Sequence, residues 1–268
     1  IFADMIVNPT KNEKISNHYE HSRLRLQRRR RHPGRSENHL ALGAYAATAI
    51  TAITVQNTTG VRAIHPVPPV FVRGQIEAVM DDIRPDAIKI GMINDIEIVK
   101  VISAAAQVPT AYVIFDPVMV STSGHKLIED DAIAALTDDL MPLTSPHHTQ
   151  SEEAEVLTGH PINNVEEMKS AALELLKFGC KAVLLKGGHL EGGLMCDVLQ
   201  IAGEVPYLFT STKIESPNTH GTGCTLSSAI ATFLALGYVM PQAVERAKRY
   251  VTHGIEAEDI RIGKDTAL

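Results

Sequence analysis

From about residue 40 onward, short runs of apolar and β-branched residues alternate with stretches whose apolar residues recur at helical spacing. In residues 71–83, for example, Val72, Ile76 and Met80 fall on one side of a helix. The pattern predicts strands at residues 87–90, 111–115 and 182–185, and helices at residues 71–83, 96–106, 131–140, 165–178, 222–236 and 241–257. Residues 46–55 fit either a strand or the end of a helix that leads into one.

Strands that alternate with helices of this length are typical of parallel βαβ units, in which helices cover both faces of one sheet. We therefore expect an α/β fold. In such sheets, ligands bind beyond the carboxyl ends of the strands. The candidates for binding are the residues that follow the predicted strands: Gln56-Asn57, Gly91-Met92, Asp116-Pro117 and Lys186-Gly187-Gly188.

The composition is that of a globular protein, because 44% of the 268 residues are hydrophobic and 21% are charged. A formal net charge of -6 argues against a nucleic-acid partner, and the absence of Trp argues against stacking on bases. Three cysteines without a paired spacing suit a reducing compartment. No apolar run has the length of a membrane span or the form of a signal peptide, so we expect no membrane partner and a cytoplasmic location.

Residues 1–39 stand outside the alternating pattern, and we assign residues 40–268 to the folded domain. The first segment contains an arginine cluster without apolar periodicity: Arg23, Arg25, Arg28, Arg29, Arg30, Arg31 and Arg35. One interpretation is a basic arm for phosphate-rich partners, and another is a disordered tail. A third interpretation, a slip of the reading frame, depends on a resemblance to a known family.

Gly221, Thr222 and Gly223 stand directly before an apolar helix that begins near Cys224. Small residues let several backbone N–H groups point at one spot, and the helix N-terminus adds about half a positive charge. Such a site stabilises the negative charge on a transferred phosphoryl group. The same field favours a thiolate at Cys224, which could take a proton from a substrate hydroxyl. The plainer alternative is a glycine turn that begins a helix with a buried cysteine.

The longer string at residues 218–231, Asn-Thr-His-Gly-Thr-Gly-Cys-Thr-Leu-Ser-Ser-Ala-Ile-Ala, closely resembles the C-terminal signature of the ribokinase superfamily. Most members have an aspartate base where this chain has Cys224, and a cysteine there is similar to the hydroxymethylpyrimidine kinase branch and related pyridoxal-phosphorylating enzymes. Further matches occur in order at residues 41–45, 53–58, 89–92, 116–124, 153–157 and 185–189. The resemblance implies a ribokinase-like three-layer α/β/α fold with a mostly parallel central sheet.

The resemblance also implies ATP and Mg²⁺ as cofactors, a homodimer, and roles for single residues. Gln56 would hydrogen-bond an aminopyrimidine ring and Met92 would pack on it. Lys186 would contact the ATP phosphates. Glu153 would help to hold Mg²⁺ through water, since that cation prefers carboxylates and water. Asp116 either serves the Mg²⁺–phosphate region or caps the following turn. The first three have plainer alternatives: a polar strand-end residue, a core methionine and a solvated turn lysine.

Five other residues of interest receive no catalytic role. We expect Asp197 to support the loop after the strand at residues 182–185. Cys180 and Cys196 are expected to be core thiols. The adjacent pair His147-His148 is rejected as a metal site, because neighbouring residues of a strand face opposite ways.

Two segments depart from the family pattern. The family has a glycine-rich turn and a helix reading Gln-Ala-Asp-Leu-Lys-Thr before residues 41–45, whereas residues 28–39 read Arg-Arg-Arg-Arg-His-Pro-Gly-Arg-Ser-Glu-Asn-His. Codons for residues 27–39, moved by one base, can spell Ser-Gly-Gly-Ala-Gly-Ile-Gln-Ala-Asp-Leu-Lys-Thr. Codons for residues 146–151, moved in the same way, can contain Ile-Ile-Pro-Asn, which resembles the family's strand and Asn-x-x-Glu motif.

We therefore interpret residues 28–39 and 146–151 as out-of-frame readings. Two possibilities stay open: the sequence is an erroneous translation of an ordinary kinase gene, or the polypeptide has these residues and lacks part of its substrate pocket. The leading hypothesis is an ATP-dependent kinase for 4-amino-5-hydroxymethyl-2-methylpyrimidine and its monophosphate. The alternatives are a pyridoxal or pyridoxine kinase and a non-catalytic, ribokinase-like binding protein.

Overall fold

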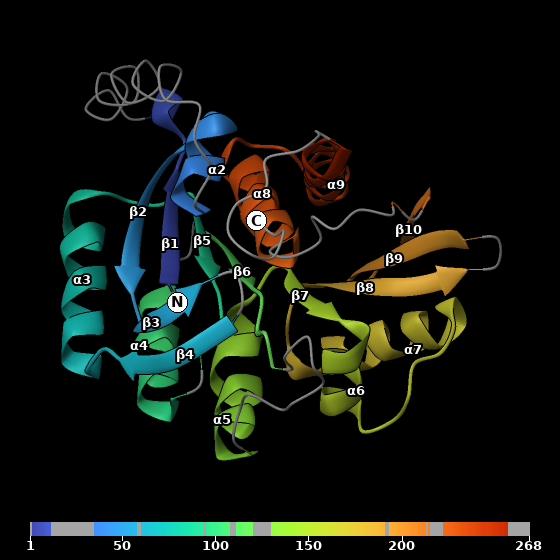
Figure 1. Cartoon of the computed structure of the whole chain (residues 1–268), viewed down its shortest axis with the longest axis horizontal. Helices are drawn as coiled ribbons and strands as arrows, with labels where there is room; N and C mark the ends of the chain where they lie inside the picture. Colours follow the sequence, from blue (N-terminus) through green and yellow to red (C-terminus); the bar gives the residue numbers. More distant parts are fainter. Residues whose placement is uncertain are drawn as a thin grey trace. The chain divides into compact units, whose positions relative to one another are not determined.

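The computed structural model describes residues 2–11, 35–57, 60–93, 95–107, 111–119, 130–190, 193–212, 214 and 222–256. The chain, whose helices and strands are labelled in Figure 1, divides into two compact units. The first consists of residues 1–89, 110–112 and 215–268, and the second of residues 90–109 and 113–214.

The strands of the first unit begin with β1 (Phe2–Val7), which lies between β2 (Tyr45–Ile50) and β5 (Ala87–Ile90). β1 and β2 pair antiparallel. Residues 52–66 form a separate antiparallel ribbon of β3 (Ala52–Asn57) and β4 (Gly60–Pro66). Residues 46–55 are therefore extended, and the alternative of a helix end at this position is wrong.

The helices of the first unit are α2 (Arg35–Ala41), α3 (Pro69–Asp82), α8 (Thr222–Ala235) and α9 (Met240–Glu256). Those predicted at residues 71–83, 222–236 and 241–257 are confirmed with small shifts of their ends. α8 is built mostly from small and apolar residues, and it packs against α9, α2 and β1 (Figure 1). α9 presents Ala243, Val244 and Ala247 as its buried face.

The prediction that residues 1–39 stand outside the α/β pattern is wrong at both ends of that segment. β1 pairs with β2, and Thr48 Oγ1 donates a 2.8 Å hydrogen bond to the buried Asp4 carboxylate. His39, at the end of α2, is fully buried, and its Nδ1 lies 2.7 Å from Thr232 Oγ1 of α8. Long-range pairing of this kind has no local signature in the sequence. Residues 12–34, with most of the arginine cluster, lie outside the described residues.

The second unit has five neighbouring strands in the order β10-β9-β8-β7-β6. β6 (Tyr112–Phe115), β7 (His147–Gln150) and the first part of β8 (Ala182–Leu190) are parallel. β9 (Leu194–Ile201) and β10 (Tyr207–Thr212) extend this sheet in antiparallel pairing. The carboxyl ends of β6 and β7 therefore meet at one edge of the sheet.

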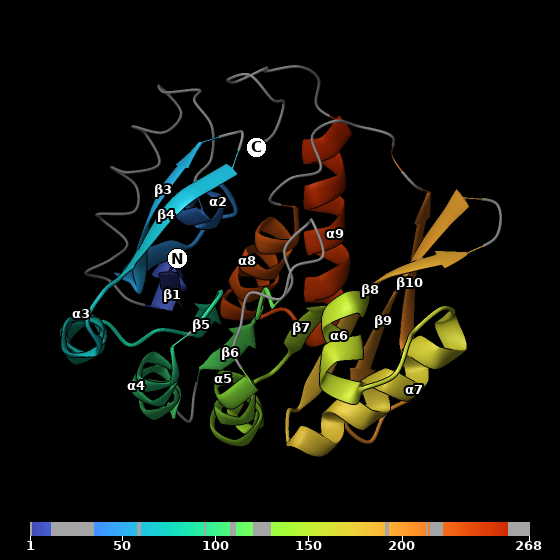
Figure 2. The same ribbon diagram turned by 60° about the horizontal axis from the view of Figure 1, so that its bottom comes forward.

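The helices of the second unit are α4 (Ile96–Ala106), α5 (Asp130–Ala135), α6 (Ser151–Thr158) and α7 (Val165–Leu175). α5 continues as a π-helical turn at Leu136–Leu140, and α7 as a 3₁₀ turn at Leu176–Phe178, so the helices predicted at residues 131–140 and 165–178 are confirmed. α6 packs against β7 and β8, and α7 packs against β8 and β9 (Figure 2). Within the ranges described, no helix is both long and apolar enough to cross a membrane.

The strand predicted at residues 182–185 is longer than expected, because β8 continues through Lys186, Gly187 and Gly188 to Leu190. The register with β9 shifts between Leu185 and Gly188, which is a β-bulge. Gly187 has a φ of 97°, a backbone conformation that glycine adopts without steric penalty. The glycines that we took as the end of the strand instead allow it to bend and continue.

Candidate functional site

Three predicted site residues gather at the carboxyl ends of β6, β7 and the parallel part of β8. Asp116 directly follows β6, Glu153 lies in the first turn of α6 after β7, and Lys186 of β8 is the register partner of Gln150. Met92 is half-buried two residues beyond the end of β5, and Asp116 N donates a 2.9 Å hydrogen bond to Ile90 O of that strand. This confirms that the sheet edge collects residues from several strands.

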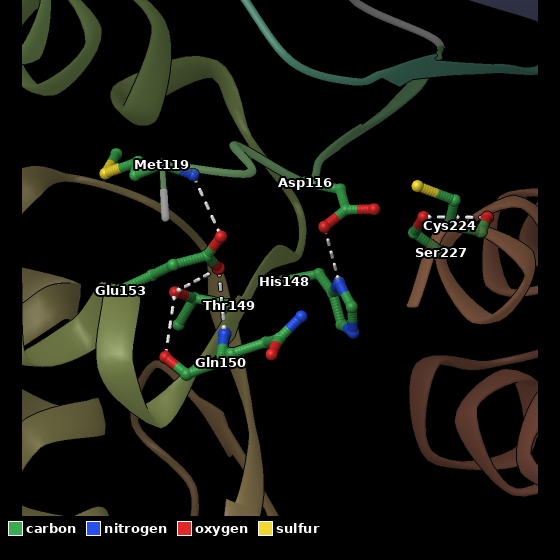
Figure 3. Close-up of polar contacts among 8 residues, drawn as sticks. All are labelled: Asp116, Met119, His148, Thr149, Gln150, Glu153, Cys224 and Ser227. Carbon is green, nitrogen blue, oxygen red and sulfur yellow. Dashed lines mark hydrogen bonds and ion pairs between the residues drawn. The ribbon is translucent and has the colours of Figure 1, made fainter. Parts of the chain in front are cut away.

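Asp116 is buried, and its Oδ1 lies 3.2 Å from Nδ1 of His148, which is also buried (Figure 3). The parallel register that aligns Phe115 with His147 brings the next residue of each strand side by side. The sequence did not indicate this pair, because it follows from strand register alone. In this pair the imidazole of His148 holds the carboxylate of Asp116, and both side chains are buried from solvent.

Glu153 is 2% exposed and both of its carboxylate oxygens accept hydrogen bonds (Figure 3). Oε1 accepts from Met119 N at 2.9 Å. Oε2 accepts from Gln150 N at 3.0 Å and from Thr149 Oγ1 at 3.3 Å. Burial raises the pKa of Glu153 above its ordinary value, while the bonds from the Gln150 and Met119 amides act in the opposite direction.

Lys186 is half-buried, and its backbone is held from two sides. Ser151 Oγ donates a 2.8 Å hydrogen bond to Lys186 O, and Gly187 N donates one of 3.2 Å to Asp197 Oδ1. Asp197 therefore supports the backbone directly after residues 182–185, as expected, although this stretch is a continuation of β8 and not a loop. Cys180 and Cys196 are both buried, as expected of core thiols, and burial raises the pKa of Cys180 to about 12.

The first unit contains the predicted phosphate-binding turn. Thr222, Gly223 and Cys224 form the first turn of α8, where backbone N–H groups lack intrahelical acceptors. Cys224 is partly exposed, and Ser227 Oγ donates to its carbonyl oxygen at 3.1 Å (Figure 3). Gly221 lies outside the described residues, as does the side chain of Gln56, whose backbone lies in β3.

The two carboxylates fit a divalent cation differently. Asp116 offers the hard oxygen ligand that Mg²⁺ prefers. Glu153 does not fit as a direct ligand, because its two oxygens already accept three hydrogen bonds from the protein. No cluster of three or more His, Cys, Asp and Glu side chains that could hold a metal ion occurs in the part of the chain that the structure describes.

Comparison with known proteins shows which family the chain resembles. The model of the family described as phosphomethylpyrimidine kinase matches residues 38–267. The chain is 42% identical over 226 residues to the hydroxymethylpyrimidine/phosphomethylpyrimidine kinase of Rhizobium meliloti, covering 84% of this chain and 85% of that one. It is 45% identical over 215 residues to the thiamine biosynthesis bifunctional protein ThiED of Geobacter sulfurreducens, and this match spans 80% of the chain but only 44% of the relative.

Two solved structures have the same fold. The phosphomethylpyrimidine kinase of Clostridium difficile 630 matches with a TM-score of 0.73 and 39% identity, over 82% of this chain and 91% of that one. The pyridoxal kinase of Staphylococcus aureus in complex with ADP matches with a TM-score of 0.78 and 28% identity, over 87% and 84%. The expected ribokinase-like α/β fold with a mostly parallel central sheet is confirmed. On the family match and the 42% identity together, the chain belongs to the phosphomethylpyrimidine kinase family.

Proposed function

We propose that this chain transfers the γ-phosphoryl group of ATP to 4-amino-5-hydroxymethyl-2-methylpyrimidine and then to its monophosphate. The observation that supports this most is Cys224 in the first turn of α8, within the signature string of a chain that belongs to the phosphomethylpyrimidine kinase family. ATP use is supported by related kinases whose structures contain ADP or AMP-PCP. In the cell we expect a cytoplasmic homodimer.

The proposed chemistry is an in-line transfer. The substrate hydroxyl oxygen bonds to the γ-phosphorus, the bond from that phosphorus to the β–γ bridging oxygen breaks, and ADP leaves. The thiolate of Cys224 takes the hydroxyl proton. The backbone N–H groups of residues 221–223 stabilise the charge on the transferred group. Lys186 neutralises charge on the ATP phosphates, and Gln56 and Met92 hold the pyrimidine ring.

We also propose that Mg²⁺ binds at Asp116. A bound Mg²⁺ would neutralise charge on the ATP phosphates during transfer. Asp116 is the residue of the described chain that we expect to hold it, because its buried carboxylate lies at the carboxyl end of β6, at the edge of the sheet where β7 also ends. His148 orients that carboxylate.

Pyridoxal phosphorylation is the second candidate. It is favoured by the close structural match to the pyridoxal kinase of Staphylococcus aureus, whose TM-score of 0.78 exceeds the 0.73 of the phosphomethylpyrimidine kinase of Clostridium difficile. The sequence identities rank in the opposite order, 28% to the pyridoxal kinase against 39% to the phosphomethylpyrimidine kinase. On the identities we favour the pyrimidine substrate.

A coupled assay of ADP release separates these functions. The folded chain is incubated with ATP and Mg²⁺ and with the pyrimidine alcohol, with pyridoxal, or with neither. We expect release that depends on the pyrimidine alcohol and exceeds that with pyridoxal. The reverse order would support the pyridoxal kinase. ADP release that no substrate increases, in a sample that melts cooperatively, would exclude both kinases and favour a binding protein.

A further inference from the structure

The turn after β6 contains an unusual backbone conformation. Val118 has a φ of 45°, the left-handed region that a β-branched residue rarely adopts. Such a conformation costs energy and persists only when the surrounding structure holds it. The turn comprises residues 116–119, so the conformation of Val118 determines how the chain leaves Asp116.

Glu153 holds this turn from the far side. Its Oε1 accepts the amide N–H of Met119, the residue directly after Val118, at 2.9 Å. Its Oε2 accepts the Gln150 amide at 3.0 Å, so one buried carboxylate joins the turn after β6 to the turn between β7 and α6 (Figure 3). Met119 is fully buried, so solvent cannot replace the carboxylate as acceptor.

Asp116 itself is held by contacts with two neighbouring strands. Asp116 N is bonded to Ile90 O, and its carboxylate to His148 of β7. The tie from Glu153 to Met119 fixes the chain three residues after Asp116. These contacts, all within the second unit, help to set the position and orientation of the Asp116 carboxylate.

We infer that Glu153 is a positioning residue, which holds the turn at residues 116–119 so that Asp116 is presented to the phosphates, and that it is not a ligand of the cation. This inference rests on the proposed function for its catalytic consequence. Its structural content, a carboxylate that ties two turns together, stands on the hydrogen bonds of Glu153 alone.

Glu153→Gln tests the inference. Glutamine has one acceptor oxygen, so either the Met119 amide or the Gln150 amide loses its partner. We expect the melting temperature in EDTA to fall by about 3–8 °C. Well below both melting temperatures, kcat should fall about 10- to 100-fold through misplacement of Asp116. The Mg²⁺ concentration that gives half of the MgADP-induced rise in melting temperature should stay unchanged.

Glu152→Gln is the matched control, since Glu152 is exposed in the same first turn of α6 and makes the same charge change. It should leave all three measurements unchanged. A milder variant, Thr149→Val, removes the 3.3 Å bonds of Thr149 Oγ1 to Glu153 and to Gln150 O but leaves both amide bonds of Glu153, and it should show a smaller loss of the same kind if Glu153→Gln does not fold.

A metal ligand would behave differently. Its loss would leave the melting temperature in EDTA unchanged or higher, because a buried charge is removed, and would raise the half-maximal Mg²⁺ concentration about tenfold. That result would overturn the inference. So would an unchanged kcat in Glu153→Gln. Absence of substrate-dependent ADP release from the unaltered chain would instead refute the proposed function, and the melting curves would then decide the role of Glu153 by themselves.

Discussion

His147 and His148 are neighbours in β7, so their side chains project to opposite faces of the sheet. His148 meets Asp116. His147 is fully buried against Phe115, with ring centroids 5.6 Å apart, and neither of its ring nitrogens has a hydrogen-bond partner among the residues that the structure describes. A buried polar group without a partner is destabilising. The position is therefore suited to an apolar side chain, which agrees with the isoleucines of the shifted reading.

His147→Ile should stabilise the protein. Removing two unsatisfied ring nitrogens from the core is expected to raise the free energy of unfolding by about 1–3 kcal/mol at neutral pH. Urea unfolding followed by circular dichroism measures the change. His65→Ile, on the exposed β4, is the strand-matched control and should stay within about 0.5 kcal/mol. Equal or lower stability in His147→Ile would show that the site is not apolar.

Acid should act on this same histidine. Burial, aided by the charge of His148, lowers the pKa of His147 from 6.5 to about 3, against a smaller opposing effect of Asp116. Between these values the unfolded chain binds the proton and the folded chain does not, so stability falls as the pH falls from about 6.5. The advantage of His147→Ile in unfolding free energy should widen between about pH 7 and pH 5. A constant difference would contradict the burial of a neutral imidazole.

Cys224 is the residue on which the proposed chemistry depends most. Cys224→Ala should lower kcat by about 10²–10⁴-fold, as is usual for loss of a general base, while the melting temperature stays close to that of the unaltered chain. The coupled ADP assay measures it. Cys224→Asp, with the base that most of the superfamily has, should retain more turnover than the alanine variant. An unchanged rate in Cys224→Ala would remove Cys224 from this role.

At the scale of elements, the bulge in β8 links strand geometry to the site. Lys186 and Gly187 lie in the irregular stretch, with their backbone bonded to Ser151 and Asp197. The bend depends on Gly187, whose φ of 97° disfavours any side chain. The bulge thus places the Lys186 backbone next to the N-terminus of α6.

Gly187→Ala should lower the free energy of unfolding by about 1–2 kcal/mol through the cost of the left-handed conformation. It should also raise KM for ATP, because Lys186 moves with the bulge. Gly74→Ala is the informative control, since Gly74 lies exposed inside α3 with open space around it. There alanine should raise stability by about 0.5–1 kcal/mol. Equal effects of the two substitutions would argue against a strained bulge.

At the scale of the whole molecule, the resemblance to the family implies that residues 28–39 stand where other members have part of the substrate pocket. Replacing them with Ser-Gly-Gly-Ala-Gly-Ile-Gln-Ala-Asp-Leu-Lys-Thr should raise turnover with the pyrimidine alcohol well above that of the chain as written. Replacing His147 alone with isoleucine should change stability more than turnover, since it is His148 and not His147 that contacts Asp116. No gain from the glycine-rich segment would reject the reading-frame interpretation, which the nucleotide sequence of codons 16–40 and 144–152 tests directly.

The sequence by itself determined the α/β class and most helices, and it placed Cys224 at the start of a helix, in the turn for which we propose phosphate binding. These features follow from local periodicity and from one contiguous sequence motif, and both signals can be recognised without knowledge of the fold. Only the tertiary structure decided that β1 pairs with β2, that Asp116 meets His148, and that both oxygens of Glu153 are engaged by Met119, Gln150 and Thr149. Such contacts depend on strand register and burial. They join residues that are distant in the chain, so no characteristic spacing in the sequence indicates them.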